Sequence, residues 1–259
     1  MRIRNIAILT IGQVLSLAGT VIVIVLGGIV GASLAPSPVW ATLPVALGVV
    51  GTALFSIPAA LLMQRTGRRL GFMGAAAAAS LTALLAATAI AQGSFALFCA
   101  AALLWGAMSA FAVQYRFAAA ESAEPRYTGR AVSFVLLGGI PGAFLGPELA
   151  RRTKDWLPAE LYTGSFISLA ILSALVVVLM LFYQDVMPRR EAVPGTGRPL
   201  REIVVQPPYL AAILSGALAY GVMSFVMTAA PVHMHQPGGY SLQQITWVIQ
   251  SHIAAIGRS

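Results

Sequence analysis

The chain has 259 residues, of which 58% are hydrophobic and only 9% are charged. Soluble domains carry about 25% charged residues, so this composition excludes a soluble globular domain. The formal net charge of +8 comes from basic residues in short segments between apolar runs, a pattern of membrane topology rather than of nucleic-acid binding. A single cysteine, Cys99, excludes a disulfide framework within the chain.

Four long stretches contain no Asp, Glu, Lys or Arg: residues 5–64, 70–115, 161–184 and 203–257. Charge-free apolar runs of about 20 residues span a bilayer as helices, whereas barrel strands alternate over segments of about 10 residues. We therefore expect an all-α membrane protein with about eight transmembrane helices. In chain order these are residues 6–34, 41–63, 70–91, 95–118, 130–150, 162–184, 209–232 and 241–256.

The Lys and Arg residues are distributed unevenly between the two sides that these helices define. Twelve lie in the N-terminus and in segments 64–69, 116–130 and 185–208, against three on the other side, Arg151, Arg152 and Lys154. The positive-inside rule then predicts a cytoplasmic N-terminus. Segment 185–208 is polar and rich in Pro and Gly. We expect it to be a cytoplasmic linker between a six-helix bundle (1–184) and an incomplete second bundle (209–259).

The fifth predicted helix contains the sequence GGIPGAFLGPELA. Gly138, Gly142 and Gly146 recur every four residues, so they share one helical face and permit close helix contact. Pro141 and Pro147 weaken the backbone ladder beside that face. Two interpretations stay open: tight helix packing, or a bending point used in a transport cycle.

The order of elements and the loop after the second helix resemble the major facilitator superfamily of transporters. Residues 60–69, ALLMQRTGRR, resemble the superfamily's G-x-x-x-D-R-x-G-R-R loop, with Gln64 in place of the Asp and Ala60 in place of the first Gly. The matching residues are Arg65, Gly67, Arg68 and Arg69. This resemblance implies a conformational-gating loop, in which Gln64 can hydrogen-bond but supplies no charge. The alternative is a basic loop that only sets topology.

The resemblance also implies a twelve-helix carrier that works by alternating access. This sequence ends at the eighth predicted helix. We therefore expect a C-terminally truncated transporter that lacks four helices of the second bundle.

The seventh predicted helix carries two methionines one turn apart, Met223 and Met227. Residues at i and i+4 share a helical face, and thioether sulfur selects Cu(I). His252 in the next predicted helix is a candidate third ligand, because ionisable residues inside membrane helices are usually functional. The competing interpretation is that the methionines fill gaps in a helical core.

A further cluster, His233, Met234 and His235, follows Pro231 at the outer end of the seventh helix. It is a candidate collecting site for copper, or else part of a solvated loop. The Met pair resembles the M-x-x-x-M hallmark of the CcoA-like copper importers. Their second hallmark, H-x-x-x-M, is only half matched, because Ile256 stands four residues after His252.

We therefore expect a secondary transporter of the cytoplasmic (inner) membrane, a monomer, with copper as the transported substrate and with no cofactor. The sequence contains no phosphate loop, nucleophile elbow or H-E-x-x-H motif, so we do not expect an enzyme. Two alternatives stay open. The chain could import a small organic molecule such as riboflavin, as a close relative within the same branch does, or it could be an inactive truncated transporter.

Overall fold

The computed structural model describes residues 3–157, 161–186, 202, 204–235 and 239–256, and every regular element among them is a helix. The predicted all-α fold is therefore confirmed for the described residues, with boundaries within a few residues of those expected. The longer helices are α1 (Ile3–Leu34), α2 (Leu43–Thr66), α3 (Arg68–Ala91), α4 (Phe95–Ala112), α5 (Tyr115–Ser122), α6 (Thr128–Leu137), α7 (Gly139–Thr153), α8 (Thr163–Leu181), α10 (Pro207–His235) and α11 (Leu242–Ile256). Two 3-10 turns, η1 (Pro38–Trp40) and η2 (Pro125–Tyr127), precede α2 and α6.

The fourth and fifth predicted helices are each divided into two in the structure. Between α4 and α5 the backbone tightens, so that the Gln114 N–H donates to the Phe111 carbonyl only three residues earlier. Between α6 and α7 the Gly138 N–H is shared by the carbonyls of Phe134 and Val135, at 3.2 Å each. Each pair still forms one apolar segment, residues 95–122 and 125–153.

Seven segments of the described chain are long and apolar enough to cross a membrane. The protein is thus a multi-pass membrane protein. The eighth predicted span differs, because α11 has 15 described residues and a hydrocarbon core requires about 20.

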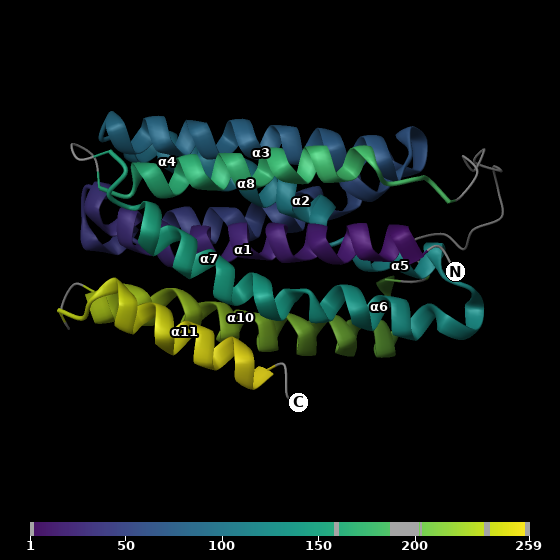
Figure 1. Ribbon diagram of the computed structural model, residues 1–259. Helices are drawn as coiled ribbons and strands as arrows, with labels where there is room; N and C mark the ends of the chain where they lie inside the picture. The colour runs from purple at the N-terminus through teal and green to yellow at the C-terminus, as the bar shows by residue number, and fades with distance from the viewer. Residues whose placement is uncertain (1–2, 158–160, 187–201, 203, 236–238, 257–259) are drawn as a thin grey trace.

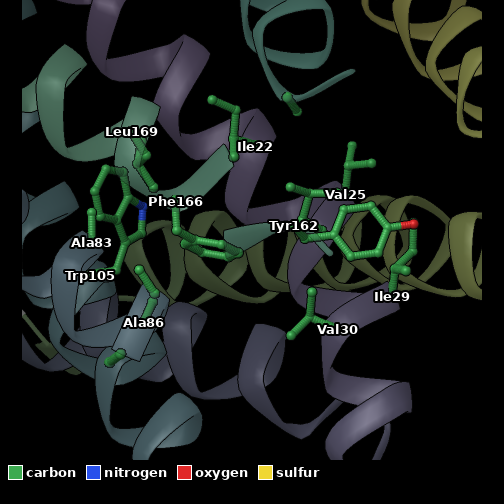
Figure 2. Packing of buried hydrophobic residues seen from close by; sticks show 14 of the residues in the cluster. Ile22, Val25, Ile29, Val30, Ala83, Ala86, Trp105, Tyr162, Phe166 and Leu169 are labelled. Atoms are coloured by element: carbon green, nitrogen blue, oxygen red, sulfur yellow. The ribbon is translucent and has the colours of Figure 1, made fainter. Parts of the chain in front are cut away.

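The first six spans pack against one another, and two core clusters hold their buried apolar side chains, the first also including Leu242, Ile245 and Ile249 of α11. The first contains Ile22, Val25 and Ile29 of α1 together with Trp105 of α4 and Phe166 of α8; in Figure 2 Val25 and Ile29 lie beside Tyr162. These side chains are almost fully buried, because the helices pack against one another.

The second cluster lies nearer the end of the bundle where α1 begins, α2 meets α3 and α8 ends. We call this end the basic end. Phe72 of α3 sits at its centre, with its ring edge-on to Tyr115 at 4.7 Å and to Tyr183 at 6.0 Å between centroids. Met63 and Met180 complete the contact from α2 and α8.

The helices α10 and α11 lie together on one side of the six-span bundle (Figure 1). Residues 207–223 of α10 are all exposed, and burial begins only near its C-terminal end. There Val232 and the Thr228 carbonyl approach Gly28 of α1. Helix α11 packs against α7, and Gln250 donates to the Phe144 carbonyl at 3.3 Å.

The predicted linker 185–208 falls largely on residues 187–201 and 203, which lie outside the described residues. The division into a bundle at 1–184, a linker and a second bundle at 209–259 therefore stays a prediction. Helix α10 begins at Pro207, two residues before the start expected from the sequence.

Candidate functional site

A cavity lies inside the six-span bundle, between α1, α3, α4, α5 and α8. The space in it that a small molecule can occupy is about 40 Å³, enough for a few water molecules. The space exists because α3 presents three alanines to it, Ala75, Ala76 and Ala79. The remaining wall consists of Leu15, Ser16, Thr20, Phe72, Trp105, Met108, Ser109, Phe111, Ala112, Tyr115, Ser173 and Val176.

The polar groups on this wall are neutral hydroxyls. Thr20, Ser109 and Ser173 each donate to a carbonyl one turn earlier, at 3.0, 2.9 and 3.0 Å. Their oxygen lone pairs stay available to accept a hydrogen bond. Ser16 and Tyr115 pair with each other at 3.4 Å. Because none of the lining residues is charged, the cavity suits a neutral polar molecule and disfavours an ion.

The apolar part of the wall is aromatic. Phe72, Trp105, Phe111 and Tyr115 all line the cavity, and each is at most 9% exposed. Aromatic rings offer flat, polarisable faces that pack well against a planar ligand. The cavity therefore combines ring surfaces with hydroxyls, the two kinds of group that bind a polar heterocycle.

Trp105 has a second property that sets it apart. Its Nε1 is buried and has no hydrogen-bond partner among the described residues. Such an unsatisfied donor costs about 1–3 kcal/mol, so native proteins contain few of them. The indole also lines a second, smaller cavity of about 20 Å³, between α1, α2, α3, α4 and α8. In Figure 2 the nitrogen edge of the indole is turned toward Phe166 rather than toward Ala83.

The predicted gating loop, residues 64–69, lies at the basic end. Arg68 donates to both carboxylate oxygens of Glu121 in α5, at 3.1 and 2.7 Å, and to the Gln114 side-chain oxygen at 3.3 Å. The side chains of Arg68 and Glu121 are 20% and 25% exposed. Gln64 and Arg65 are exposed. The loop is thus joined to the end of the fourth span by a two-point ion pair.

The same loop contacts the segment that follows α8 through Asp185. The Arg69 N–H donates to the Asp185 carboxylate at 3.0 Å, which places a negative charge at the N-terminus of α3. Gly67 has φ = 92°, and a Cβ there would lie 2.7 Å from Asp185 Oδ2. Both the backbone conformation and the close carboxylate therefore require glycine at this position.

Sequence reasoning did not identify Glu121, Gln114 or Asp185 as partners of the loop. One feature of the sequence could have indicated them: the chain has only eight Asp and Glu residues, so few carboxylates can pair with its arginines. An acidic residue at the end of an apolar span is then a natural partner for a nearby arginine.

The glycines of the fifth span face α1. A Cβ added at Gly138 or Gly142 would lie 2.8 Å from the Thr10 carbonyl or 2.6 Å from the Val14 carbonyl, and one at Gly146 would meet the carbonyl of Ala18. The three glycines thus contact the α1 backbone at three successive turns, which brings the two helix backbones close together. The geometry fits the packing interpretation, and the break at Gly138 leaves the bending interpretation open.

The two prolines of this span differ in their positions. Pro141 is in the first turn of α7, where its missing N–H removes no helical bond. Pro147 is inside the helix and buried. Beyond it, Glu148 accepts from Arg151 at 2.7 Å and from Arg152 at 2.5 Å.

The structure places the predicted copper ligands on α10 and α11, away from the interior cavity. Met223 is 40% exposed, whereas Met227 and Met234 are partly buried and pack against the first core cluster. His233 is exposed. The side chains of His235 and His252 lie outside those that the structure describes. Among the described residues, no three of His, Cys, Asp and Glu are grouped to hold a metal ion, a finding that leaves a thioether site untested.

Comparison with known proteins identifies the group to which this fold belongs. The sequence profile of the Major Facilitator Superfamily matches residues 9–259. The chain belongs to the Major Facilitator Superfamily. Within it, a crystal structure described as a bacterial homolog of the human lysosomal transporter Spinster, in an inward-facing and unoccupied conformation, has a similar fold. Its TM-score is 0.71 at 16% identity, covering 95% of this chain and 58% of that one.

Two sequence relatives from the superfamily cover 98% of this chain. The riboflavin transporter RfnT of Brucella anthropi is 40% identical over 255 residues. The uncharacterized MFS-type transporter YddS of Bacillus subtilis is 27% identical over 268 residues. The chain spans 64% of the length of the first and 61% of the second. The predicted superfamily is therefore confirmed, whereas the copper-importer branch finds no support in these relatives.

Proposed function

We propose that this chain belongs to an importer of riboflavin, or of a closely related neutral heterocycle, in the cytoplasmic membrane. The observation that carries the proposal is the 40% identity to the Brucella anthropi riboflavin transporter across 98% of this chain. Because the chain spans 64% of that relative, transport by this chain is itself part of the proposal.

The chemistry of the interior cavity supports a neutral organic substrate. Its wall offers four aromatic rings and five hydroxyls without a charged residue. Rings and hydroxyls of this kind can pack against and hydrogen-bond a flavin ring, but the cavity of about 40 Å³ must widen before it holds one. A metal ion would find no charged or sulfur-rich ligand set there, since Met108 is the only thioether on the wall.

The proposed mechanism is alternating access by a monomer whose basic end faces the cytoplasm. The positive-inside rule supports that orientation, because the loop with Arg65, Arg68 and Arg69 lies at this end. The contact of Arg68 with Glu121 holds the loop against the fourth span in the present conformation. In the proposal, residues 64–69 gate the transport cycle, and the break at Gly138 lets the fifth span bend during it.

The first test is riboflavin uptake by a riboflavin-auxotrophic bacterium that lacks its own importer. We expect cells that express the chain to take up radiolabelled riboflavin in a saturable manner, and cells with the empty vector not to. Binding to the purified chain in detergent, followed by flavin fluorescence, separates recognition from transport. Absence of both uptake and binding would contradict the proposal.

Copper stays the second candidate substrate, and the spacing of Met223 and Met227 on α10 is the observation that favours it. The Met223→Leu, Met227→Leu double variant removes both thioethers and keeps apolar side chains of similar size. If riboflavin is the substrate, its binding and uptake will be unchanged in this variant. Stoichiometric Cu(I) binding by the original chain that disappears in the variant would instead support copper, with His252 as the expected third ligand.

A further inference from the structure

We propose that the turn between the fourth and fifth spans binds the phosphate of an anionic phospholipid headgroup through Arg126 and Arg130, which are held beside the ring of Tyr127. The turn, residues 123–130, consists of the residues after α5, the η2 turn and the first residues of α6. This inference goes beyond the proposed function, because it concerns a lipid of the surrounding membrane and not the transported substrate.

The first step is the arrangement of the two arginines. The guanidinium carbon of Arg126 lies 4.6 Å from the centroid of the Tyr127 ring, and that of Arg130 lies 5.8 Å from the same centroid. Cation–π contact with one ring thus restrains two guanidinium groups close to each other. Each guanidinium is a planar fork of N–H donors that matches the oxygens of a phosphate, so the pair is preorganised for such a group.

The second step is the balance of charge at this turn. Glu124 accepts from Arg126 Nε at 3.1 Å, in a pair whose side chains are 47% and 71% exposed. Arg130 is exposed and has no carboxylate partner among the described residues. The two arginines therefore carry more positive charge than this carboxylate offsets, and the excess attracts an anion.

The third step decides between a lipid and a soluble anion. The turn joins two apolar segments, residues 95–122 and 125–153, so it lies at their membrane ends, beside the headgroup layer. Phe134 and Leu137 are 56% and 54% exposed, and they follow Arg130 on the same face of α6. A phospholipid has the complementary order, a charged phosphate followed by acyl chains. A soluble phosphate would use only the arginines.

The site is tested with the purified full chain in detergent, by native mass spectrometry that resolves bound phospholipid. The chain is titrated with phosphatidylglycerol, which is anionic, and with phosphatidylcholine, which has the same acyl chains and no net charge. The test variant is the double change Arg126→Gln, Arg130→Gln. Its matched control is Arg152→Gln, Lys154→Gln, which removes two positive charges at the opposite end of the bundle (Figure 1). Arg152 is 71% exposed and paired with a carboxylate, as Arg126 is.

We expect the original chain to bind phosphatidylglycerol more tightly than phosphatidylcholine. The Arg126→Gln, Arg130→Gln variant should raise the Kd for phosphatidylglycerol about 25-fold, about fivefold for each arginine beside an anionic headgroup. The control should leave this Kd unchanged. Equal Kd values for the two lipids, an unchanged Kd in the test variant, or an equal loss in the control would overturn the assignment.

Two single changes keep the test independent of the fold of the double variant. Arg130→Gln breaks no ion pair among the described residues, so its unfolding temperature should match that of the original chain while the Kd rises about fivefold. Tyr127→Leu removes the ring that restrains both arginines and should raise the Kd, whereas Tyr127→Phe keeps the ring and should not. Equal Kd values in Tyr127→Leu and Tyr127→Phe would overturn the part given to the ring.

A competition experiment identifies the source of the phosphate. Glycerol 1-phosphate carries a phosphate without acyl chains, so millimolar concentrations of it should not displace phosphatidylglycerol. Displacement would assign the arginines to a soluble phosphate and overturn the lipid proposal. A dimer of the purified chain that dissociates in the Arg126→Gln, Arg130→Gln variant would place a second copy on this surface and would also overturn it.

Discussion

Replacement of Gly142 by alanine tests the backbone contact between α7 and α1. The added Cβ would lie 2.6 Å from the Val14 carbonyl oxygen and 3.3 Å from both the Ala18 nitrogen and the Leu17 Cβ. Two of these three atoms belong to the backbone and cannot rotate away, so the helices must separate. Overpacking of this kind costs about 1–3 kcal/mol, offset by about 1 kcal/mol from the better helix propensity of alanine.

The matched control is Gly74→Ala in α3, where an added Cβ meets nothing within 4 Å. That variant gains the propensity term alone. The free energies of unfolding of the two variants should therefore differ by about 1–3 kcal/mol. For a domain of this size, each kcal/mol changes the Tm by about 2–4 °C. Gly142→Ala should have the lower Tm of the two.

Thermal unfolding can be followed with a thiol-reactive dye, because Cys99 is the single cysteine and is buried. The dye reacts only when the bundle opens. A Tm for Gly142→Ala equal to or above that of Gly74→Ala would refute the claim that the glycines set the distance between α1 and α7.

Two more changes test the basic end by the same unfolding assay. Glu121→Gln removes the charge that Arg68 contacts in a partly buried site, so we expect the free energy of unfolding to fall by about 1–3 kcal/mol. The control Asp155→Asn, in the more exposed pair with Lys154, should lower it by at most about 1 kcal/mol. Equal losses in the two variants would contradict this expectation. Asn5 is 1% exposed and bonds the backbone of Gln184 in both directions, at 2.7 and 3.3 Å. Asn5→Ala should therefore destabilise the chain by about 1–3 kcal/mol, and an unchanged Tm would show that this bridge contributes little.

The helices could be predicted because the sequence separates charge from apolar residues so cleanly. Residues 5–64 and 70–115 each hold two spans without a charged side chain, and the bilayer requirement then sets the helix lengths. The breaks at Gln114 and Gly138 could not be predicted in the same way. Each is a local tightening of hydrogen bonds inside an apolar run, and such runs look continuous in composition.

The contacts between segments far apart in the sequence could not be predicted from it. Arg68 was identified as a loop residue, but its partner Glu121 is 53 positions away, and spacing carries no information at that distance. The interior cavity was missed because Ala75, Ala76 and Ala79 read as ordinary small residues of a packed helix. Only the arrangement of five helices shows that they leave space next to aromatic side chains.

The one-sided attachment of α10 has a mechanical consequence. The helix meets α1 near Thr228 and Val232, whereas residues 207–223 are exposed along their whole length. From Thr228 to Pro207 the free arm is about 30 Å long, so a tilt of about 10° at the contact displaces its far end by about 5 Å. A small tilt of α10 around Gly28 would therefore produce its largest displacement at the end that leads toward the predicted linker.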